Sequence, residues 1–97
     1  THVPTSDLRI LPHGTAYMTD AGMCGDYDSV IGGNKKEWIN KFLKASSFKR
    51  IKASDKQNTL CGVIIKVSED TGLSSTAKQL IVGDILENKI PSEKHFL

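Results

Sequence analysis

The sequence predicts an α+β domain, on three observations. Its 97 residues are 38% hydrophobic and 25% charged, which is typical of one globular core and too short for two. Residues 35–45 space their apolar side chains as an amphipathic helix does. Residues 59–67 and 75–82 are rich in strand-forming residues and are separated by a segment of turn length. We therefore expect one main helix and mostly antiparallel strands.

The N-terminal third is expected to hold one strand between two loops. Pro4 and Pro12 disfavour helix over the first thirteen residues. Residues 14–20 contain a short run of strand-forming residues, which we expect to be a buried strand. Residues 20–33 combine glycines with carboxylates that hydrogen-bond their own backbone, so a structured loop is predicted there.

The predicted helix covers residues 35–45. Asn34 precedes it and is a suitable N-cap, because its side chain can accept a hydrogen bond from a free amide of the first turn. The apolar side chains form a single stripe that is expected to face the core: Trp38, Ile39, Phe42 and Leu43.

Three strands are expected after the helix. Residues 48–53 alternate imperfectly, residues 59–67 are the strongest strand of the chain, and residues 75–82 follow after a hairpin turn at residues 69–72. We expect residues 1–83 to form one domain portion and residues 84–97 to form a C-terminal tail.

The charge is unevenly distributed along the chain. Residues 1–34 carry a net charge of −3, residues 35–56 carry +6, and the remainder carries −1, for a total of +2. Residues 35–56 are called the basic block below. We interpret this block first as a solvated helix face, because stacking aromatic residues are not interleaved with it on the same face. The alternative is that the chain is a non-catalytic interaction module that binds a partner or RNA through the basic block.

The cysteines and the hydropathy pattern point to a cytoplasmic protein. Cys24 and Cys61 have no second Cys or His at metal-binding spacing, so we expect reduced thiols rather than a zinc site or a disulfide framework. No apolar run is long enough to cross a membrane and no leader is recognisable, so no membrane partner is expected.

The residues alone do not assemble a complete catalytic site. His2, His13 and His95 are isolated from one another, and each by itself is typical of a surface histidine. Phosphate-loop, paired-histidine helix and Ser-His-Asp patterns are not found in the sequence. No catalytic residue is therefore assigned to this chain.

The N-terminal segments resemble one known family. They read THVPTSD at residues 1–7, RILP at 9–12, GTAYMTD at 14–20 and GMCGDYDSVIG at 22–32. Together they are similar to the C-terminal part of bacterial calcineurin-like metallophosphoesterases of the 2′,3′-cyclic-nucleotide 2′-phosphodiesterase type. The similarity is dense over residues 1–32 and continues more loosely to about residue 81. Because the similarity is to the C-terminal part of these proteins, we expect the chain to be a fragment of a longer protein, which a start at Thr1 permits but does not by itself establish.

The resemblance implies a fold and a metal-ligand role. The fold would be the C-terminal portion of a four-layer α/β/β/α sandwich. Within the family, the stretch before the position of His2 reads Gly-Thr-His and makes a His-x-His pair in which both histidines bind metal. By that match His2 would be the last ligand of a centre of two divalent metal ions, with manganese or iron expected. The other ligands lie in sequence absent here, so the isolated chain is expected to be inactive.

The resemblance also implies partners for the intact protein. Its substrate would be a cyclic nucleotide or an RNA-derived 2′,3′-cyclic phosphate, and the strands of residues 48–82 would support a homo-oligomer. The chain departs from the family pattern at Cys24, where Thr is common, and at Asp26, where Pro is common. These departures leave the substrate preference open.

Overall fold

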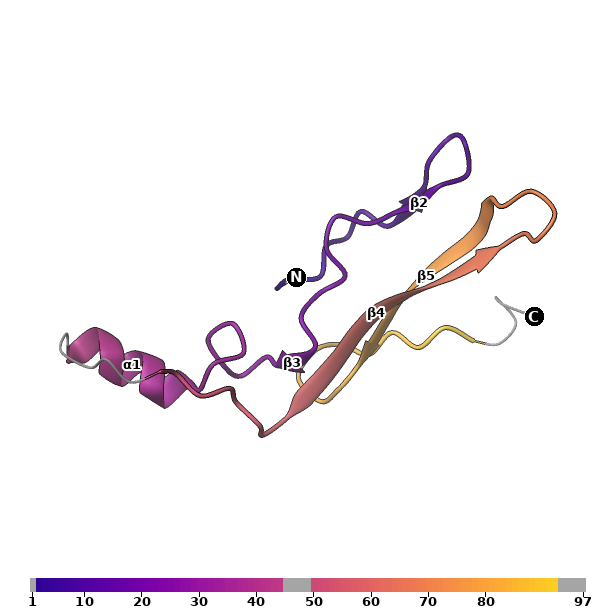
Figure 1. Ribbon diagram of the computed structural model, residues 1–97. Coiled ribbons are helices and arrows are strands. Elements are labelled where there is room, and N and C mark those ends of the chain that lie inside the picture. Colours follow the sequence, from indigo (N-terminus) through magenta and orange to yellow (C-terminus); the bar gives the residue numbers. More distant parts are fainter. Residues whose placement is uncertain (1, 45–49, 93–97) are drawn as a thin grey trace.

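Helix α1 (Lys35–Leu43) and the tip of a long β-hairpin lie at opposite ends of an elongated molecule (Figure 1). The computed structural model describes residues 2–44 and 50–92 and measures 58 × 25 × 19 Å along its principal axes. The elements follow the order β1 (Arg9–Ile10), β2 (Ala16–Tyr17), β3 (Gly25–Asp26), α1, β4 (Asn58–Val67) and β5 (Ser74–Val82). The chain is therefore a small α+β structure with one helix and antiparallel strands in its described part.

The β4–β5 hairpin is the largest element. Its strands pair in antiparallel register from Leu60 opposite Val82 to Val67 opposite Ser74, with one irregularity at Lys66/Val67. The connecting turn closes with hydrogen bonds from Gly72 N to Ser68 O at 2.8 Å and from Ser68 N to Leu73 O at 2.9 Å. Gly72 has a φ of +73°, which a residue without Cβ adopts at no steric cost. The predictions for residues 59–67 and 75–82 and for the turn between them are confirmed.

The N-terminal third has one sheet of its own and is attached to the hairpin by one short strand pairing and one loop hydrogen bond. β1 and β2 form a two-stranded antiparallel sheet, and β3 pairs with the first residues of β4. The Ser74 amide also donates to Gly14 O at 2.7 Å, which holds the β1–β2 loop against the tip of the hairpin. The prediction of a loop throughout residues 20–33 is thus incomplete, because two residues of this segment form strand β3 by pairing with β4.

The most buried side chains gather where β3, the start of β4 and the end of β5 meet. Among the described residues they are Cys61, Ile81, Thr59 and Asp26. Two of the four are polar, and the core is small because the remaining surfaces of the hairpin and of α1 are largely exposed.

Helix α1 begins as predicted. The Asn34 side chain caps it by accepting a hydrogen bond from the Glu37 amide at 3.2 Å. The predicted burial of the apolar stripe, however, is wrong: Phe42 and Leu43 are each 78% exposed, and only Trp38 is half-buried. The reason is that α1 lies at the far end of the molecule, where no other described helix or strand covers it (Figure 1).

Two predicted strands are corrected. Residues 14–20 form only the two-residue strand β2, which is not buried, because Tyr17 is exposed and Ala16 half-buried. Residues 48 and 49 of the predicted strand 48–53 lie outside the described part. Over residues 50–53 only Ala53 forms a single bridge, with Gly33, because this segment pairs with an irregular loop instead of a straight strand.

The chain turns back after β5. Gly83 N donates to Asn88 Oδ1 at 2.9 Å, and Ile81 and Lys89 exchange two backbone hydrogen bonds of 2.9 Å. Among residues 2–44 and 50–92 there is no helix of the length and apolarity that a membrane crossing requires.

Candidate functional site

His2 is fixed to the protein by its backbone and by that of its neighbour. The amides of His2 and Val3 donate to one carboxylate oxygen of Asp20, at 3.0 and 3.4 Å, and the other oxygen accepts from Gly22 N at 2.8 Å. The Gly22 amide first, and the His2 amide second, hold the pKa of the Asp20 carboxyl below its usual range. Asp20 therefore remains a charged clamp at neutral pH.

A second carboxylate, Asp7, fastens the same segment. It accepts from the Thr5 hydroxyl at 2.6 Å, from the Thr19 amide at 3.1 Å and from the Thr19 hydroxyl. These bonds, the one from the Thr19 side chain foremost, lower the pKa of Asp7 to about 2. The hydrogen bonds of Asp7 and Asp20 together hold residues 2–7 against residues 19–22. The backbone of His2 is therefore fixed relative to the rest of the chain.

Neither Asp7 nor Asp20 was singled out as an anchor from the sequence. The spacing of Asp20 and Gly22 is that of a side chain that caps its own turn, and this was the available signal. The bonds to His2 and Val3 could not be foreseen, because they join segments separated by seventeen and eighteen positions.

An apolar cavity of about 360 Å³ opens beside His2. Its lining is contributed by residues from three parts of the chain: His2, Val3, Pro4, Met23, Tyr27, Ser29, Ile31 and Leu86. Tyr27 is oriented by two contacts, accepting from Met23 N at 2.8 Å and lying 3.3 Å from Cys61 Sγ. Burial, and then the contact with Cys61, raise the pKa of Tyr27 to about 12, so its hydroxyl stays neutral.

The described residues do not build a metal centre by themselves. They contain no group of three or more His, Cys, Asp or Glu side chains that could hold a metal ion. The carboxylate nearest in the hydrogen-bond network, Asp20, is already occupied by three amides. His2 is therefore one candidate ligand, and one imidazole is too few for a divalent cation.

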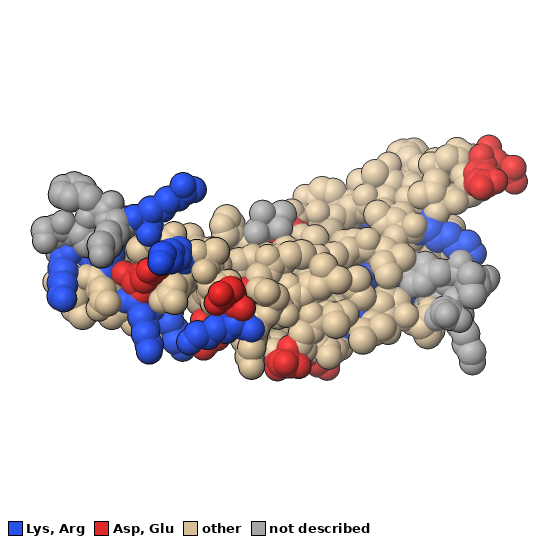
Figure 2. Space-filling model, turned by 60° about the horizontal axis from the view of Figure 1, so that its bottom comes forward, with Lys and Arg blue, Asp and Glu red and all other residues tan. Residues whose placement is uncertain are grey.

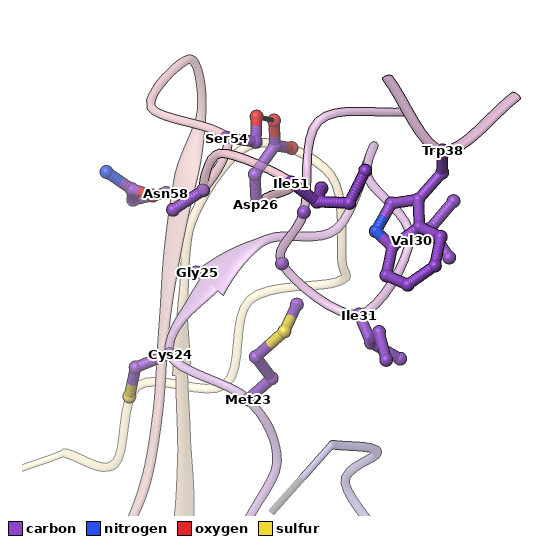
Figure 3. A pocket seen from close by; sticks show the side chains of 13 residues that line it. Met23, Cys24, Gly25, Asp26, Val30, Ile31, Trp38, Ile51, Ser54 and Asn58 are labelled. Atoms are coloured by element: carbon purple, nitrogen blue, oxygen red, sulfur yellow. Dashed lines mark hydrogen bonds between the residues drawn. The ribbon is translucent and has the colours of Figure 1, made fainter. Parts of the chain in front are cut away.

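A second cavity, of about 510 Å³, lies between the loop of residues 23–33 and the segment that returns from α1 (Figure 3). Figure 3 shows Asp26 and Ser54 beside one another at its edge, with Trp38 and Ile31 on another wall. Cys24 and Asp26 both line this cavity.

Asp26 is a structural residue of this loop. It is only 2% exposed, and it accepts from the Ser54 hydroxyl and from the Asp28 amide at 2.7 Å. These two bonds, in that order, hold the pKa of its carboxyl below the usual range. Asp26 thus holds the two segments on this side of the cavity together.

Cys24 and Cys61 are both free thiols, as the sequence predicted. The Cys24 thiol bonds to the backbone of Cys61, donating to its carbonyl oxygen at 3.2 Å and accepting from its amide at 3.4 Å. Cys24, the residue before β3, therefore forms a structural contact with β4.

Known proteins are similar to this chain over most of its length. The model of the family described as YmdB-like protein matches residues 1–80. A 2′,3′-cyclic-nucleotide 2′-phosphodiesterase of Bacillus subtilis is 38% identical over 84 residues, which are 87% of this chain and 31% of that protein. A putative phosphatase/phosphodiesterase of Mycoplasma pneumoniae is 46% identical over 72 residues, 73% of this chain and 25% of that protein.

Solved structures agree with these matches. A crystal structure of a novel phosphatase from Mycoplasma pneumoniae superposes with a TM-score of 0.73 at 39% identity, over 86% of this chain and 30% of that one. A hypothetical protein from Thermus thermophilus gives a TM-score of 0.70 at 31% identity, over 86% of this chain and 32% of that one. The chain thus spans about a third or less of the length of the relatives it matches.

Proposed function

The chain belongs to the YmdB-like protein family, and from this membership we propose that it is part of a cytoplasmic, metal-dependent phosphodiesterase acting on cyclic nucleotides or 2′,3′-cyclic phosphates. The observation that carries the proposal is the 38% identity, over 87% of this chain, to a protein named for that reaction. Because the chain spans only 31% of that relative, the activity is assigned to the whole protein and not to these 97 residues.

In this proposal His2 supplies one ligand of a centre of two divalent metal ions. The Asp20 carboxylate supports that role, because it holds the backbone of His2 and Val3 and so limits the positions open to the imidazole. A fixed ligand loses less conformational entropy when a metal binds. The remaining ligands would come from outside this chain, within the same calcineurin-like four-layer sandwich.

The lining of the cavity beside His2 favours a substrate whose phosphate carries an organic group. Most of its lining is apolar, with Val3, Met23 and Ile31 among the contributing residues. Such a lining would bind a nucleoside better than inorganic phosphate, because burial of apolar surface is favourable and burial of an unpaired charge is not.

The proposal includes a homo-oligomer formed along β4. Among the described residues β4 pairs with β3 only at Asn58 and Thr59, so the rest of that edge has no strand beside it. Leu60, Ile65 and Val67 of this strand are exposed. An exposed apolar edge strand favours pairing with another chain. Light scattering after size-exclusion chromatography tests this part, and a monomer would contradict it.

The test of the phosphodiesterase proposal compares two proteins. The first is the 97-residue chain, and the second is a hybrid in which this chain replaces the matching segment of the Bacillus subtilis relative. With manganese added, we expect the hybrid to hydrolyse 2′,3′-cyclic AMP and the isolated chain to be inactive. Hydrolysis by the isolated chain, or a folded hybrid without activity, would contradict the proposal.

A further inference from the structure

The segment that follows β5 is folded back onto that strand. Ile81 and Lys89 exchange two backbone hydrogen bonds of 2.9 Å, and the Lys89 ammonium donates to Gln79 Oε1 at 3.0 Å. The Gly83 amide donates to Asn88 Oδ1 at 2.9 Å, which closes the turn between the paired residues. This turn therefore has a fixed position at the end of β5.

Gly83 brings the turn close to the start of β4. A Cβ at Gly83 would lie 2.5 Å from Thr59 Oγ1 and 3.0 Å from Thr59 Cα, so a side chain does not fit there without movement. Thr59 is only 2% exposed and belongs to the small core. The turn therefore lies against the part of the molecule where β3, β4 and β5 meet.

One side chain of this turn, that of Leu86, faces the cavity beside His2. Leu86 is half-buried, whereas its neighbours Ile85 and Glu87 are exposed. It lines the cavity of about 360 Å³ that His2 also lines. Because the family model matches residues 1–80, Leu86 adds to this cavity a wall that the family model does not describe.

The lining of this cavity is suited to the uncharged part of a substrate. Among the described residues that form it there is no Lys, Arg, Asp or Glu. Figure 2 shows most of the Lys and Arg side chains of the face that it draws gathered at the end of the molecule that α1 occupies. A phosphate group therefore gains little from this lining, whereas the apolar surface of a ligand is buried favourably in it.

The hydroxyl groups in the lining already have partners. The Tyr27 hydroxyl accepts from Met23 N at 2.8 Å. The Ser29 hydroxyl donates to Asp26 O and accepts from Gly32 N at 2.9 Å. The cavity is therefore built to recognise a ligand by its shape and apolar contact more than by hydrogen bonds to these hydroxyls.

We propose that Leu86 is a specificity-determining residue, which contacts the base of a 2′,3′-cyclic nucleotide and sets the size of base that the cavity accepts. This role rests on the proposed function, in which His2 lies near the phosphate. The base, joined to that phosphate through the ribose, then enters the cavity that His2 and Leu86 both line. Recognition by shape separates a purine from a pyrimidine, but it separates adenine from guanine only weakly, because strong discrimination of polar groups requires hydrogen bonds.

The test measures kcat/KM of the hybrid with the Bacillus subtilis relative for the 2′,3′-cyclic phosphates of adenosine, guanosine, cytidine and base-free ribose. Leu86→Ala should lower the value for cyclic AMP by about tenfold and that for the ribose compound by less than about twofold, because only the first has a base to contact. Leu86→Trp narrows the cavity and should lower the value for cyclic AMP about fivefold more than that for cyclic CMP. Cyclic AMP and cyclic GMP should respond alike.

The matched control is Ile85→Ala, which removes a neighbouring apolar side chain that is outside the cavity lining. It should change each value by less than about twofold. A merely structural role of Leu86 would lower all four substrates, the base-free one included, by the same factor. That result, or an equal effect of Ile85→Ala and Leu86→Ala, would overturn the proposal.

A binding measurement separates this proposal from the phosphodiesterase proposal. Adenosine, which has no phosphate, is titrated into the 97-residue chain without metal, and the methyl signals of Leu86 are followed by NMR. We expect these signals to shift, and Leu86→Ala to weaken the binding of adenosine by about tenfold. A hybrid that hydrolyses none of the four substrates would contradict the phosphodiesterase proposal alone. Unshifted Leu86 methyl signals would overturn the role of Leu86, whether or not the hybrid is active.

Discussion

The Asp26 carboxylate accepts a hydrogen bond from the Ser54 hydroxyl, which ties β3 to the segment that returns from α1. The two residues are twenty-eight positions apart, and Asp26 is among the most buried side chains described. The bond closes one side of the cavity of about 510 Å³. The structure of this loop therefore depends on a buried carboxylate.

We expect Ser54→Ala to raise the pKa of Asp26, because the Ser54 hydroxyl is the main cause of its depression. A carboxyl whose pKa is lowered in the folded state stabilises the fold above its unfolded pKa, and this stability is lost as the pH falls. The variant should therefore also be less stable at neutral pH. Carboxyl chemical shifts followed by NMR during a pH titration measure the change, with the exposed Ser6→Ala as control. An unchanged Asp26 titration would contradict the assignment.

The stability of the chain should fall between about pH 4 and pH 2 in a manner that depends on Asp7. Its folded pKa is about 2, against an ordinary value of 3.8. The contribution of Asp7 is complete above about pH 4 and is lost as the pH falls through the folded value. Thermal melts at several pH values should show a shallower acid slope for Asp7→Asn. Identical slopes for the variant and the original chain would disprove the role of Asp7.

A methyl group at Gly33 should disturb the attachment of α1. A Cβ there would lie 2.4 Å from Trp38 Nε1 and 3.0 Å from Ile51 Cγ2, so the ring would have to move. We expect Gly33→Ala to destabilise the chain by about 1–3 kcal/mol, the usual cost of an added group in a packed place. The fluorescence of Trp38, the only tryptophan, reports the change. Gly62→Ala is the matched control, because no atom lies within 4 Å of a Cβ there.

Replacement of Asp20 should release the segment that carries His2. Asp20→Asn removes the charge that holds the amides of His2, Val3 and Gly22. We expect amide hydrogen exchange at Val3 to accelerate by about tenfold, while the Thr5 amide, bonded to the backbone carbonyl of residue 20, remains protected. Equal acceleration at both amides would indicate general unfolding in place of a local release.

The sequence predicted the β4–β5 hairpin well because its signals are local. Alternating apolar residues in Asn58–Val67 and Ser74–Val82 and a glycine in the turn lie within one stretch of chain. The N-cap of α1 at Asn34 was predicted for the same reason, since the residue that it caps lies three positions away.

Contacts between distant parts of the chain could not be predicted from the sequence alone. The pattern of Trp38 and Phe42 identified a helix but not what covers it, so the exposure of Phe42 could not be foreseen. Strand β3 is two residues long and exists because the start of β4 pairs with it, and Asp26 is buried by Ser54 from another part of the chain. At the candidate site, His2 was predicted through resemblance, whereas its clamp, Asp20, depended on tertiary contact.

The metal content of the hybrid with the Bacillus subtilis relative tests the central claim most directly. After chelation and reloading with manganese, elemental analysis should find about two metal ions per hybrid chain. We expect clearly less metal in the hybrid with His2→Ala and unchanged metal in the hybrid with His13→Ala, a histidine in the exposed β1–β2 loop. Equal metal content in the His2→Ala hybrid and the unaltered hybrid would contradict the assignment of His2 as a ligand.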